Sequence, residues 1–104
     1  MTEVQDNEDK SRFEILVDGD VAGFVDYELG TDVITMTHTE VDDAYSGQGL
    51  GKKVVAEALE QARTRGVSVR PVCPLVRKII AEDTENNYLD LVRLPDREEF
   101  DLPS

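Results

Sequence analysis

Between residues 12 and 41, the pattern of hydrophobic positions predicts strands. Residues 12–17 and 21–27 are rich in β-branched and aromatic side chains, and the turn Asp18-Gly19-Asp20 joins them, as in a β-hairpin. A second turn at residues 29–32 leads into a β-branched run over residues 33–41, which favours a long strand. Because the connections are short, we expect three consecutive antiparallel strands.

From residue 50 the apolar spacing becomes that of one buried helical face. The positions are Leu50, Val54, Val55, Ala58, Leu59 and Ala62. Gly66 predicts the end of this helix. Residues 67–72 predict a further strand, parallel to its neighbour because a long helix separates the two in sequence. Pro71 removes one ladder donor, so we expect the strand to splay away at its end. Pro74 suits the start of a second helix over residues 75–81.

These elements predict an α/β (α+β) fold with two helices. Its mixed sheet has an antiparallel N-terminal meander followed by a parallel, splayed strand pair. Residues 11–92 are predicted to form one domain, the usual outcome for a chain of 104 residues. Residues 1–10 are polar and acidic without apolar periodicity, which predicts a disordered lead-in. Residues 93–104 contain two prolines and mixed charge, and we expect an irregular tail.

Composition narrows the classes of partner. A net charge of −12 argues against nucleic-acid binding, which requires lysine and arginine on the phosphates, and weakly favours cationic substrates. No apolar run approaches the roughly 20 residues that span a bilayer, so no membrane partner is expected. The single cysteine and the lack of an export signal favour a reducing compartment, the cytoplasm. We expect a monomer by default, and no metal site, because the single histidine has no cysteine nearby in sequence.

A glycine-rich segment lies between the strand over residues 33–41 and the following helix. It reads Ser46-Gly47-Gln48-Gly49-Leu50-Gly51 and is followed by Lys52 and Lys53. Glycines let the backbone approach a ligand, and the first N–H groups of a helix lack internal partners and attract anions. The segment, called the glycine loop below, therefore predicts a phosphate or pyrophosphate site.

Two common phosphate motifs do not match the loop. A P-loop requires four residues between its first glycine and the Gly-Lys pair, but Gly47 and Gly51 enclose three, and Lys53 occupies the Ser/Thr position. The dinucleotide fingerprint would require glycine at position 52, where the sequence has lysine, and a loop that opens a βαβ unit. This loop instead follows a predicted antiparallel meander.

The loop does resemble the pyrophosphate loop of the GCN5-related N-acetyltransferase superfamily, Arg/Gln-x-x-Gly-x-Gly/Ala. Ser46 occupies the Arg/Gln position, while Gly49 and Gly51 occupy the glycine positions. The segments His38-Thr39-Glu40-Val41 and Val69-Arg70-Pro71-Val72-Cys73-Pro74 are similar to the strand end and the Pro-x-Cys-Pro segment of the small single-domain branch. The resemblance covers about residues 12–92.

This resemblance implies an N-acetyltransferase that carries an acetyl group from acetyl-CoA to a small-molecule or peptide amine. It places the pantetheine arm between the strands that end near Val41 and Val72. The expected cofactor-binding residues are Thr39, Val41, Ser46, Gly47, Gln48, Gly49, Leu50, Gly51, Lys52 and Lys53. Two departures stand out: Ser46 replaces a basic or amide residue, and residues 82–88 lack the His-Pro-Glu-Tyr-like stretch of family members, so the role of that second histidine does not transfer.

Three residues are candidates for catalysis. Cys73 precedes a predicted helix N-terminus, which lowers a thiol pKa and suits an acyl-accepting nucleophile or a proton donor to the leaving thiolate. Its alternative interpretation is a buried packing residue. His38 and Glu40 are two residues apart on one strand and so share a face, where either could relay a proton from the amine; their alternative roles are a hydrogen-bonded histidine at the core edge and a solvated glutamate.

Two other functions compete with acetyl transfer. An acyl-CoA-binding or regulatory module would keep the coenzyme cleft with little catalysis of its own. A small interaction protein without a cofactor would tolerate Gly49→Glu and would not respond to CoA.

Overall fold

A computed structural model describes residues 1–103. The strands are β1 (Thr2–Asn7), β2 (Arg12–Val17), β3 (Asp20–Leu29), β4 (Val33–Val41) and β5 (Ser68–Pro71). The helices are α1 (Leu50–Arg65), α2 (Pro74–Glu82) and α3 (Leu94–Glu99), and the 3-10 turns are η1 (Glu8–Lys10), η2 (Asp43–Tyr45) and η3 (Tyr88–Leu91). No helix within residues 1–103 combines the length and the apolar character needed to cross a membrane.

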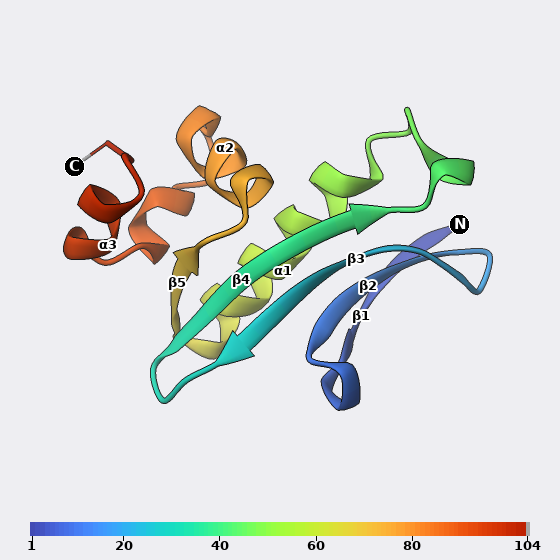
Figure 1. Cartoon of the computed structure of the whole chain (residues 1–104), viewed down its shortest axis with the longest axis horizontal. Coiled ribbons are helices and arrows are strands. Elements are labelled where there is room, and N and C mark those ends of the chain that lie inside the picture. Colours follow the sequence, from blue (N-terminus) through green and yellow to red (C-terminus); the bar gives the residue numbers. More distant parts are fainter. Residues whose placement is uncertain (104) are drawn as a thin grey trace.

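The five strands form one sheet in the order β1-β2-β3-β4-β5. The first three pairs are antiparallel and the pair of β4 with β5 is parallel. Helix α1 packs across one face of the sheet, and α2, η3 and α3 gather at its β5 end (Figure 1). The predicted α/β class, with an antiparallel meander and a parallel final pair, is therefore confirmed.

The two ends of the chain differ from the prediction. Residues 1–10 contain β1, an edge strand along β2, and residues 93–104 contain α3. The disordered lead-in and the irregular tail were wrong because both segments hold few apolar residues and are fixed by polar contacts. Asp6 of β1 accepts a 2.6 Å hydrogen bond from the Tyr27 hydroxyl and pairs with Arg65, while Arg70 of β5 pairs with Asp96 and Glu99 of α3.

The core fills the space between α1 and the sheet. The predicted helical stripe faces inward throughout, and all of its members are buried: Leu50, Val54, Val55, Ala58, Leu59 and Ala62. Gly66 ends α1 with φ 71° and donates its N–H to Ala62 and Arg63, which is a left-handed glycine cap. The apolar face of α2, formed by Val76, Ile79 and Ile80, packs into the same core.

A bulge in β4 decides which side chains face the helices. Asp26 pairs with His38, but the next residue, Tyr27, pairs with Met36, so Thr37 is the extra residue. One extra residue reverses the alternation of faces along a strand. Thr39, opposite the buried Val25, therefore lies on the helix side of the sheet. Ile34 and Met36 face the same side, even though regular alternation would put Thr39 on the face opposite Met36.

Candidate functional site

The glycine loop follows a short capped turn at the end of β4. The Asp42 side chain accepts the N–H of Ala44 at 2.9 Å and holds η2 in place. Gly47 and Gly49 then take φ values of 79° and 73°, and nothing lies within 4 Å of the position a Cβ would occupy at either. Side chains are strained in this left-handed conformation, so the glycines allow a tight loop with an open surface.

The main-chain amides of residues 47–52 have no hydrogen-bond acceptor anywhere in residues 1–103. The first bond of the helix runs from the N–H of Lys53 to the carbonyl of Gly49, at 3.1 Å, and Gly49 offers no side-chain cap. Unpartnered amides at a helix N-terminus carry partial positive charge and bind anions. This row of amides has the donor chemistry that a pyrophosphate requires.

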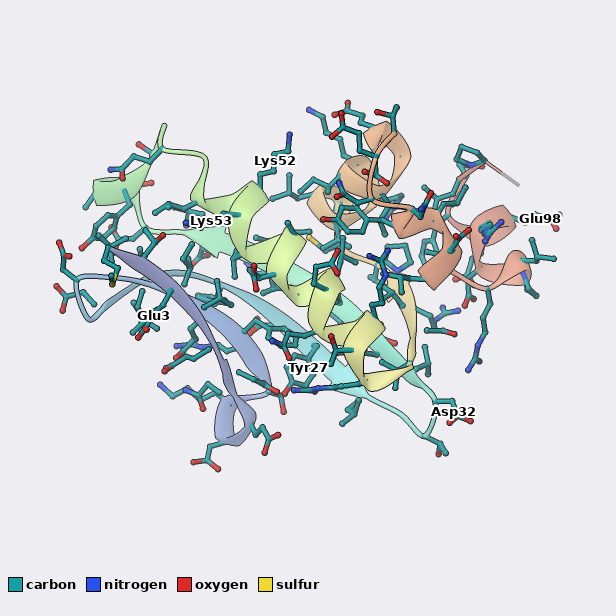
Figure 2. The ribbon with its side chains drawn as sticks, turned by 180° about the vertical axis from the view of Figure 1, so that it is seen from behind. Glu3, Tyr27, Asp32, Lys52, Lys53 and Glu98 are labelled. Carbon is teal, nitrogen blue, oxygen red and sulfur yellow. The ribbon has the colours of Figure 1, made fainter. Side chains whose placement is uncertain are left out.

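The side chains in and after the glycine loop differ in how available they are to a ligand. Leu50 is buried in the core, so it offers a ligand only its backbone. The ammonium of Lys53 bonds the hydroxyl of Thr2, whereas Lys52 points toward α2 (Figure 2). Of the two lysines, Lys52 is therefore the one available on the side of the loop that faces α2.

The parallel pairing of β4 with β5 ends early. The last pair is Met36 with Pro71, after which the N–H of Cys73 donates to the Met36 carbonyl at 2.9 Å. From Thr37 to Val41, β4 pairs with β3 alone. The sequence predicted this splay from Pro71, which cannot donate to a ladder, and the gap it leaves exposes one edge of β4.

Gly51 connects the glycine loop with this gap. A Cβ at Gly51 would lie 3.4 Å from Leu75 Cδ2 and 3.5 Å from Val41 Cγ2. The first turn of α1, the end of β4 and the start of α2 therefore meet at one point. The stretch of β4 without a β5 partner therefore ends beside the glycine loop.

Cys73 lies inside the gap as the N-cap residue of α2. The residue is 3% exposed, and its Sγ is 3.3 Å from the hydroxyl oxygen of Thr39. The structure thus brings Cys73 to the helix side of the sheet beside Thr39. The burial suits the packing interpretation, and the position at the open edge suits the catalytic one.

His38 and Glu40 lie on the other side of the sheet because of the bulge at Thr37. Their side chains are 58% and 63% exposed, and His38 Nε2 is 3.5 Å from Glu40 Oε1. The ring of Phe24 is 6.3 Å from the His38 ring, centre to centre. His38 and Glu40 share one face of β4, as predicted, but Cys73 lies on the other side of the sheet.

The face of the sheet that carries His38 and Glu40, away from the helices, also holds a cluster of polar side chains. The sequence analysis did not predict this cluster. Glu14 is almost fully buried and accepts hydrogen bonds from Gln5, Asn7 and Arg12. Burial by itself raises the pKa of Glu14, but these hydrogen bonds outweigh it and hold the pKa below its ordinary value. Arg12 also stacks over Phe24 at 4.4 Å, so the cluster supports the strands beneath His38 and Glu40.

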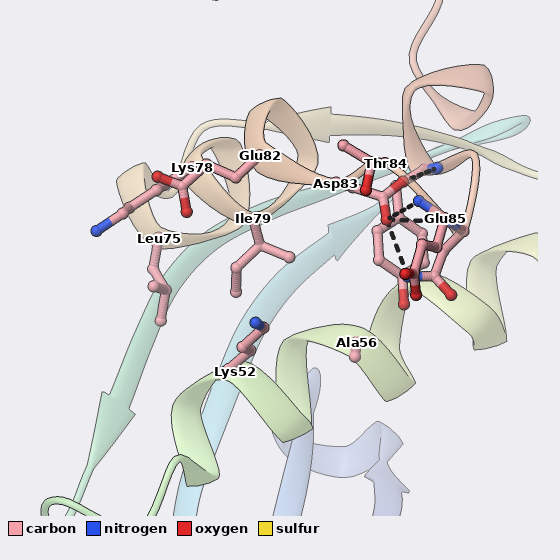
Figure 3. A pocket seen from close by; sticks show the side chains of 11 residues that line it. Lys52, Ala56, Leu75, Lys78, Ile79, Glu82, Asp83, Thr84 and Glu85 are labelled. Atoms are coloured by element: carbon pink, nitrogen blue, oxygen red, sulfur yellow. Dashed lines mark hydrogen bonds between the residues drawn. The ribbon is translucent and has the colours of Figure 1, made fainter.

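A pocket of about 430 Å³ lies between α1 and α2 (Figure 3). Sequence reasoning missed it because packing between two helices has no local pattern. Its lining residues are Lys52, Ala56, Leu75, Lys78, Ile79, Glu82, Asp83, Thr84, Glu85, Asn86 and Tyr88. Lys52 and Leu75 place the pocket next to the glycine loop. Within residues 1–103 no three His, Cys, Asp or Glu side chains are grouped to hold a metal ion.

The sequence model of a family described as GCN5-related N-acetyl-transferase matches residues 12–91. The chain belongs to the GCN5-related N-acetyltransferase family. This confirms the family resemblance and supports N-acetyltransferase activity for the chain. The assignment to the small single-domain branch stays a prediction.

Relatives of known sequence carry the same region. Protein NATD1 of Mus musculus is 26% identical over 89 residues, which cover 84% of this chain and 81% of the mouse protein. Protein NATD1 of Bos taurus is 29% identical over 62 residues, covering 60% of this chain and 55% of the bovine protein.

Solved structures confirm the GCN5-related N-acetyltransferase fold. A GCN5-like protein of Staphylococcus aureus, solved by NMR, has a TM-score of 0.64 at 24% identity and covers 88% of this chain and 87% of its own. The ribosomal-protein-S18-alanine N-acetyltransferase of Escherichia coli has a TM-score of 0.53 at 27% identity, over 56% of this chain and 38% of the enzyme. Enzymes of this family generally use acetyl-CoA and act on small-molecule or protein amines.

Proposed function

We propose that this chain binds acetyl-CoA on the glycine loop and along the open edge of β4, and transfers the acetyl group to an amine. The observation that carries the proposal is the row of unpartnered amides from residue 47 to residue 52. The first N–H groups of a helix have no acceptor within the helix, and here they lie at mostly exposed positions next to the strand end where β4 and β5 separate. A diphosphate supplies the acceptors that this row lacks.

The fit extends from the loop into the gap. Glycine at position 51 places no side chain between the first turn of α1 and the neighbouring Val41 and Leu75. The β4 edge at Thr39 to Val41 has no β5 partner, so its backbone groups suit the amide groups of a pantetheine arm. The bound acetyl-CoA supplies an activated thioester at the inner end of this path.

The residues at the gap divide the proton transfers between the two faces of the sheet. A neutral amine that arrives on the open face would give one proton to His38, with Glu40 3.5 Å behind it. As the new C–N bond forms and the C–S bond breaks, the departing thiolate takes a proton from Cys73. In the alternative two-step route, the Cys73 thiolate would attack the thioester, its C–S bond to CoA would break, and the CoA thiolate would leave with the proton that Cys73 lost. The amine would then attack acetyl-Cys73, passing its proton to His38, and the C–S bond to Cys73 would break to restore the thiolate.

Two features bear on the acceptor. The names of two structural neighbours specify an alanine of ribosomal protein S18 and nourseothricin as acceptors, so we leave both protein and small-molecule amines as candidates. The net charge of −12 weakly favours a cationic small molecule or peptide. We propose that the chain acts as a monomer on such an amine, with no nucleic-acid or membrane partner.

A second function, an acyl-CoA-binding module with little catalysis, is favoured by one observation. Cys73 is 3% exposed and its thiol already lies beside the Thr39 hydroxyl, as expected for a packing residue. The module shares the glycine loop with the enzyme and differs from it only in turnover.

A coupled assay separates the two functions. Release of free CoA thiol is followed with acetyl-CoA and a panel of polyamines, peptides and aminoglycosides, while calorimetry measures acetyl-CoA binding. Amine-dependent thiol release supports the transferase. Saturable binding without turnover on any amine favours the module, and absence of both overturns the proposal.

A further inference from the structure

Arg77 of α2 donates to three consecutive main-chain carbonyls where β5 ends. Its Nε bonds the carbonyl of Pro71 at 3.4 Å, and its Nη2 bonds that of Val72 at 2.9 Å. Its own main-chain N–H bonds the carbonyl of Cys73 at 3.0 Å, in the first turn of α2. No main-chain N–H of residues 1–103 donates to the Val72 carbonyl, so the Arg77 guanidinium supplies the donor that this carbonyl would otherwise lack.

The charge of Arg77 is not used for an ion pair. No carboxylate of the described residues lies within ion-pairing distance of its partly buried guanidinium, although the chain has 23 acidic residues against 11 lysines and arginines. A guanidinium is a planar fork of N–H donors, so its two bonds fix the carbonyls of Pro71 and Val72 relative to each other. The side chain of Arg77 therefore holds main chain in place.

The C-terminal segment contacts the same guanidinium. The central carbon of the Arg77 guanidinium lies 5.4 Å from the centre of the Phe100 ring, and that of Arg70 lies 5.2 Å from it. Arg70 is also paired with Asp96 and Glu99 of α3. Contacts between a cation and an aromatic face are attractive, so Phe100 restricts the rotamers that the long Arg77 side chain can adopt.

The bonds of Arg77 lie at the turn where β5 leaves β4. A strand that continued straight beyond Pro71 would pair with β4 from Thr37 onward and would cover its open edge. Instead, the N–H of Cys73 bonds the Met36 carbonyl at 2.9 Å, and the carbonyls of residues 71–73 accept from Arg77. Pro71 removes a ladder donor, whereas Arg77 fixes the carbonyls of the turn that follows.

We propose that Arg77 is a positioning residue for acetyl transfer, which keeps the main chain before α2 turned away from β4 and holds Cys73 at the edge of the gap. The inference rests on the proposed function, in which the pantetheine arm lies along the open edge of β4. Arg77 acts through the carbonyls of residues 71–73, while the unpartnered amides of residues 47–52 belong to a different segment. Loss of Arg77 should therefore misplace the thioester but leave the diphosphate site intact.

Steady-state kinetics of Arg77→Lys tests the inference by separating kcat from KM. Lysine keeps the charge but lacks the planar fork that bonds two carbonyls. We expect kcat for amine-dependent thiol release to fall at least about tenfold, with the KM for acetyl-CoA within about threefold of the wild-type value. The matched control is Arg93→Lys, because Arg93 bonds the Asp32 carbonyl and the Ser68 hydroxyl at the opposite end of β5; its kcat should equal that of the wild type.

Amide hydrogen exchange tests the same turn without turnover. The N–H of Cys73, which bonds the Met36 carbonyl, should exchange about tenfold faster in Arg77→Lys, while the buried amide of Val55 in α1 should exchange as in the wild type. Phe100→Leu leaves Arg77 in place but removes the ring beside it, and it should change kcat and the Cys73 exchange rate in the same direction by a smaller factor. This variant carries the test if Arg77→Lys does not fold.

The outcomes separate this inference from the proposed function. A wild-type kcat or an unchanged Cys73 exchange rate in Arg77→Lys would overturn the inference and leave the transferase intact. An equal loss of kcat in Arg93→Lys would also overturn it, because weakening either end of β5 would then have the same effect. If the wild type transfers acetyl groups to no amine, the proposed function fails, and this inference fails with it.

Discussion

The hydroxyl of Thr39 lies 3.3 Å from the thiol of Cys73, across the gap where β4 and β5 separate. The contact joins the end of the meander to the start of α2, two segments 34 residues apart. It depends on the bulge at Thr37, which turns Thr39 to the helix side and His38 to the other. Because of this one extra residue in β4, Cys73 lies on the helix side of the sheet, whereas His38 and Glu40 lie on the other side.

Cys73→Ala tests the role of the thiol. If Cys73 donates a proton or accepts the acetyl group, we expect turnover to fall at least about tenfold, with acetyl-CoA affinity within about twofold of wild type. The lost buried group should cost about 1 kcal/mol of unfolding free energy, measured by urea denaturation. Turnover close to that of the wild type would show that both catalytic roles are wrong and that Cys73 is a packing residue.

Gly49→Glu tests the anion site. The Cβ position at Gly49 faces open space, so a glutamate there places a carboxylate beside the unpartnered amides and should weaken acetyl-CoA binding by more than about tenfold. Gly19→Glu is the matched control, because Gly19 has φ 90° and equally open surroundings in the β2–β3 turn. Both variants incur backbone strain, so only a loss specific to Gly49→Glu supports the site; equal affinities would argue against it.

Glu14→Gln tests the buried carboxylate of the open face by its pH dependence. Because the folded-state pKa lies below the ordinary value of 4.5, ionised Glu14 stabilises the fold above pH 4.5, and this contribution is lost as pH falls through the folded-state value. We expect Glu14→Gln to be less stable at pH 7 by about 1–2 kcal/mol and to lose less stability on acidification. Urea unfolding between pH 3 and pH 7 measures this, and two parallel curves would refute it.

Asp6→Ala tests whether β1 is part of the folded unit. The substitution leaves the Tyr27 hydroxyl without its acceptor and Arg65 without its carboxylate, so we expect a loss of about 1–3 kcal/mol. Asp9→Ala, which removes an exposed acid from η1, should change the unfolding midpoint little. Equal midpoints for the two variants would mean that the contacts of Asp6 with Tyr27 and Arg65 add nothing to stability.

The contact of Asp6 with Tyr27 also illustrates which parts of the fold could not be predicted from the sequence. The strands β2 to β4, the stripe of α1 and the splay at Pro71 follow from local periodicity and from proline chemistry, and they were predicted. β1 and α3 were missed because the side-chain contacts that tie them to the fold, such as Asp6 with Tyr27 and Arg70 with Asp96, join residues that lie far apart in the sequence. A polar segment held by such long-range pairs has the composition of a disordered one.

The candidate site, like the fold, was predictable only where it depends on local sequence. The glycine loop is local in sequence, so its position at the N-terminus of α1 could be read directly. The bulge at Thr37 could not, because simple alternation puts His38 and Glu40 on the face of Met36. The pocket between Lys52 and Lys78 depends on how two helices pack, which residue spacing within either helix does not specify.

Amide NMR titration of the full chain with acetyl-CoA tests the central claim most directly, because it reports on the backbone donors one by one. We predict saturable shifts at one-to-one stoichiometry, largest at the amides of residues 47–52, with small changes in the β2–β3 turn around Gly19. Unchanged loop amides at saturating acetyl-CoA, or shifts confined to other elements, would contradict a diphosphate site at the N-terminus of α1.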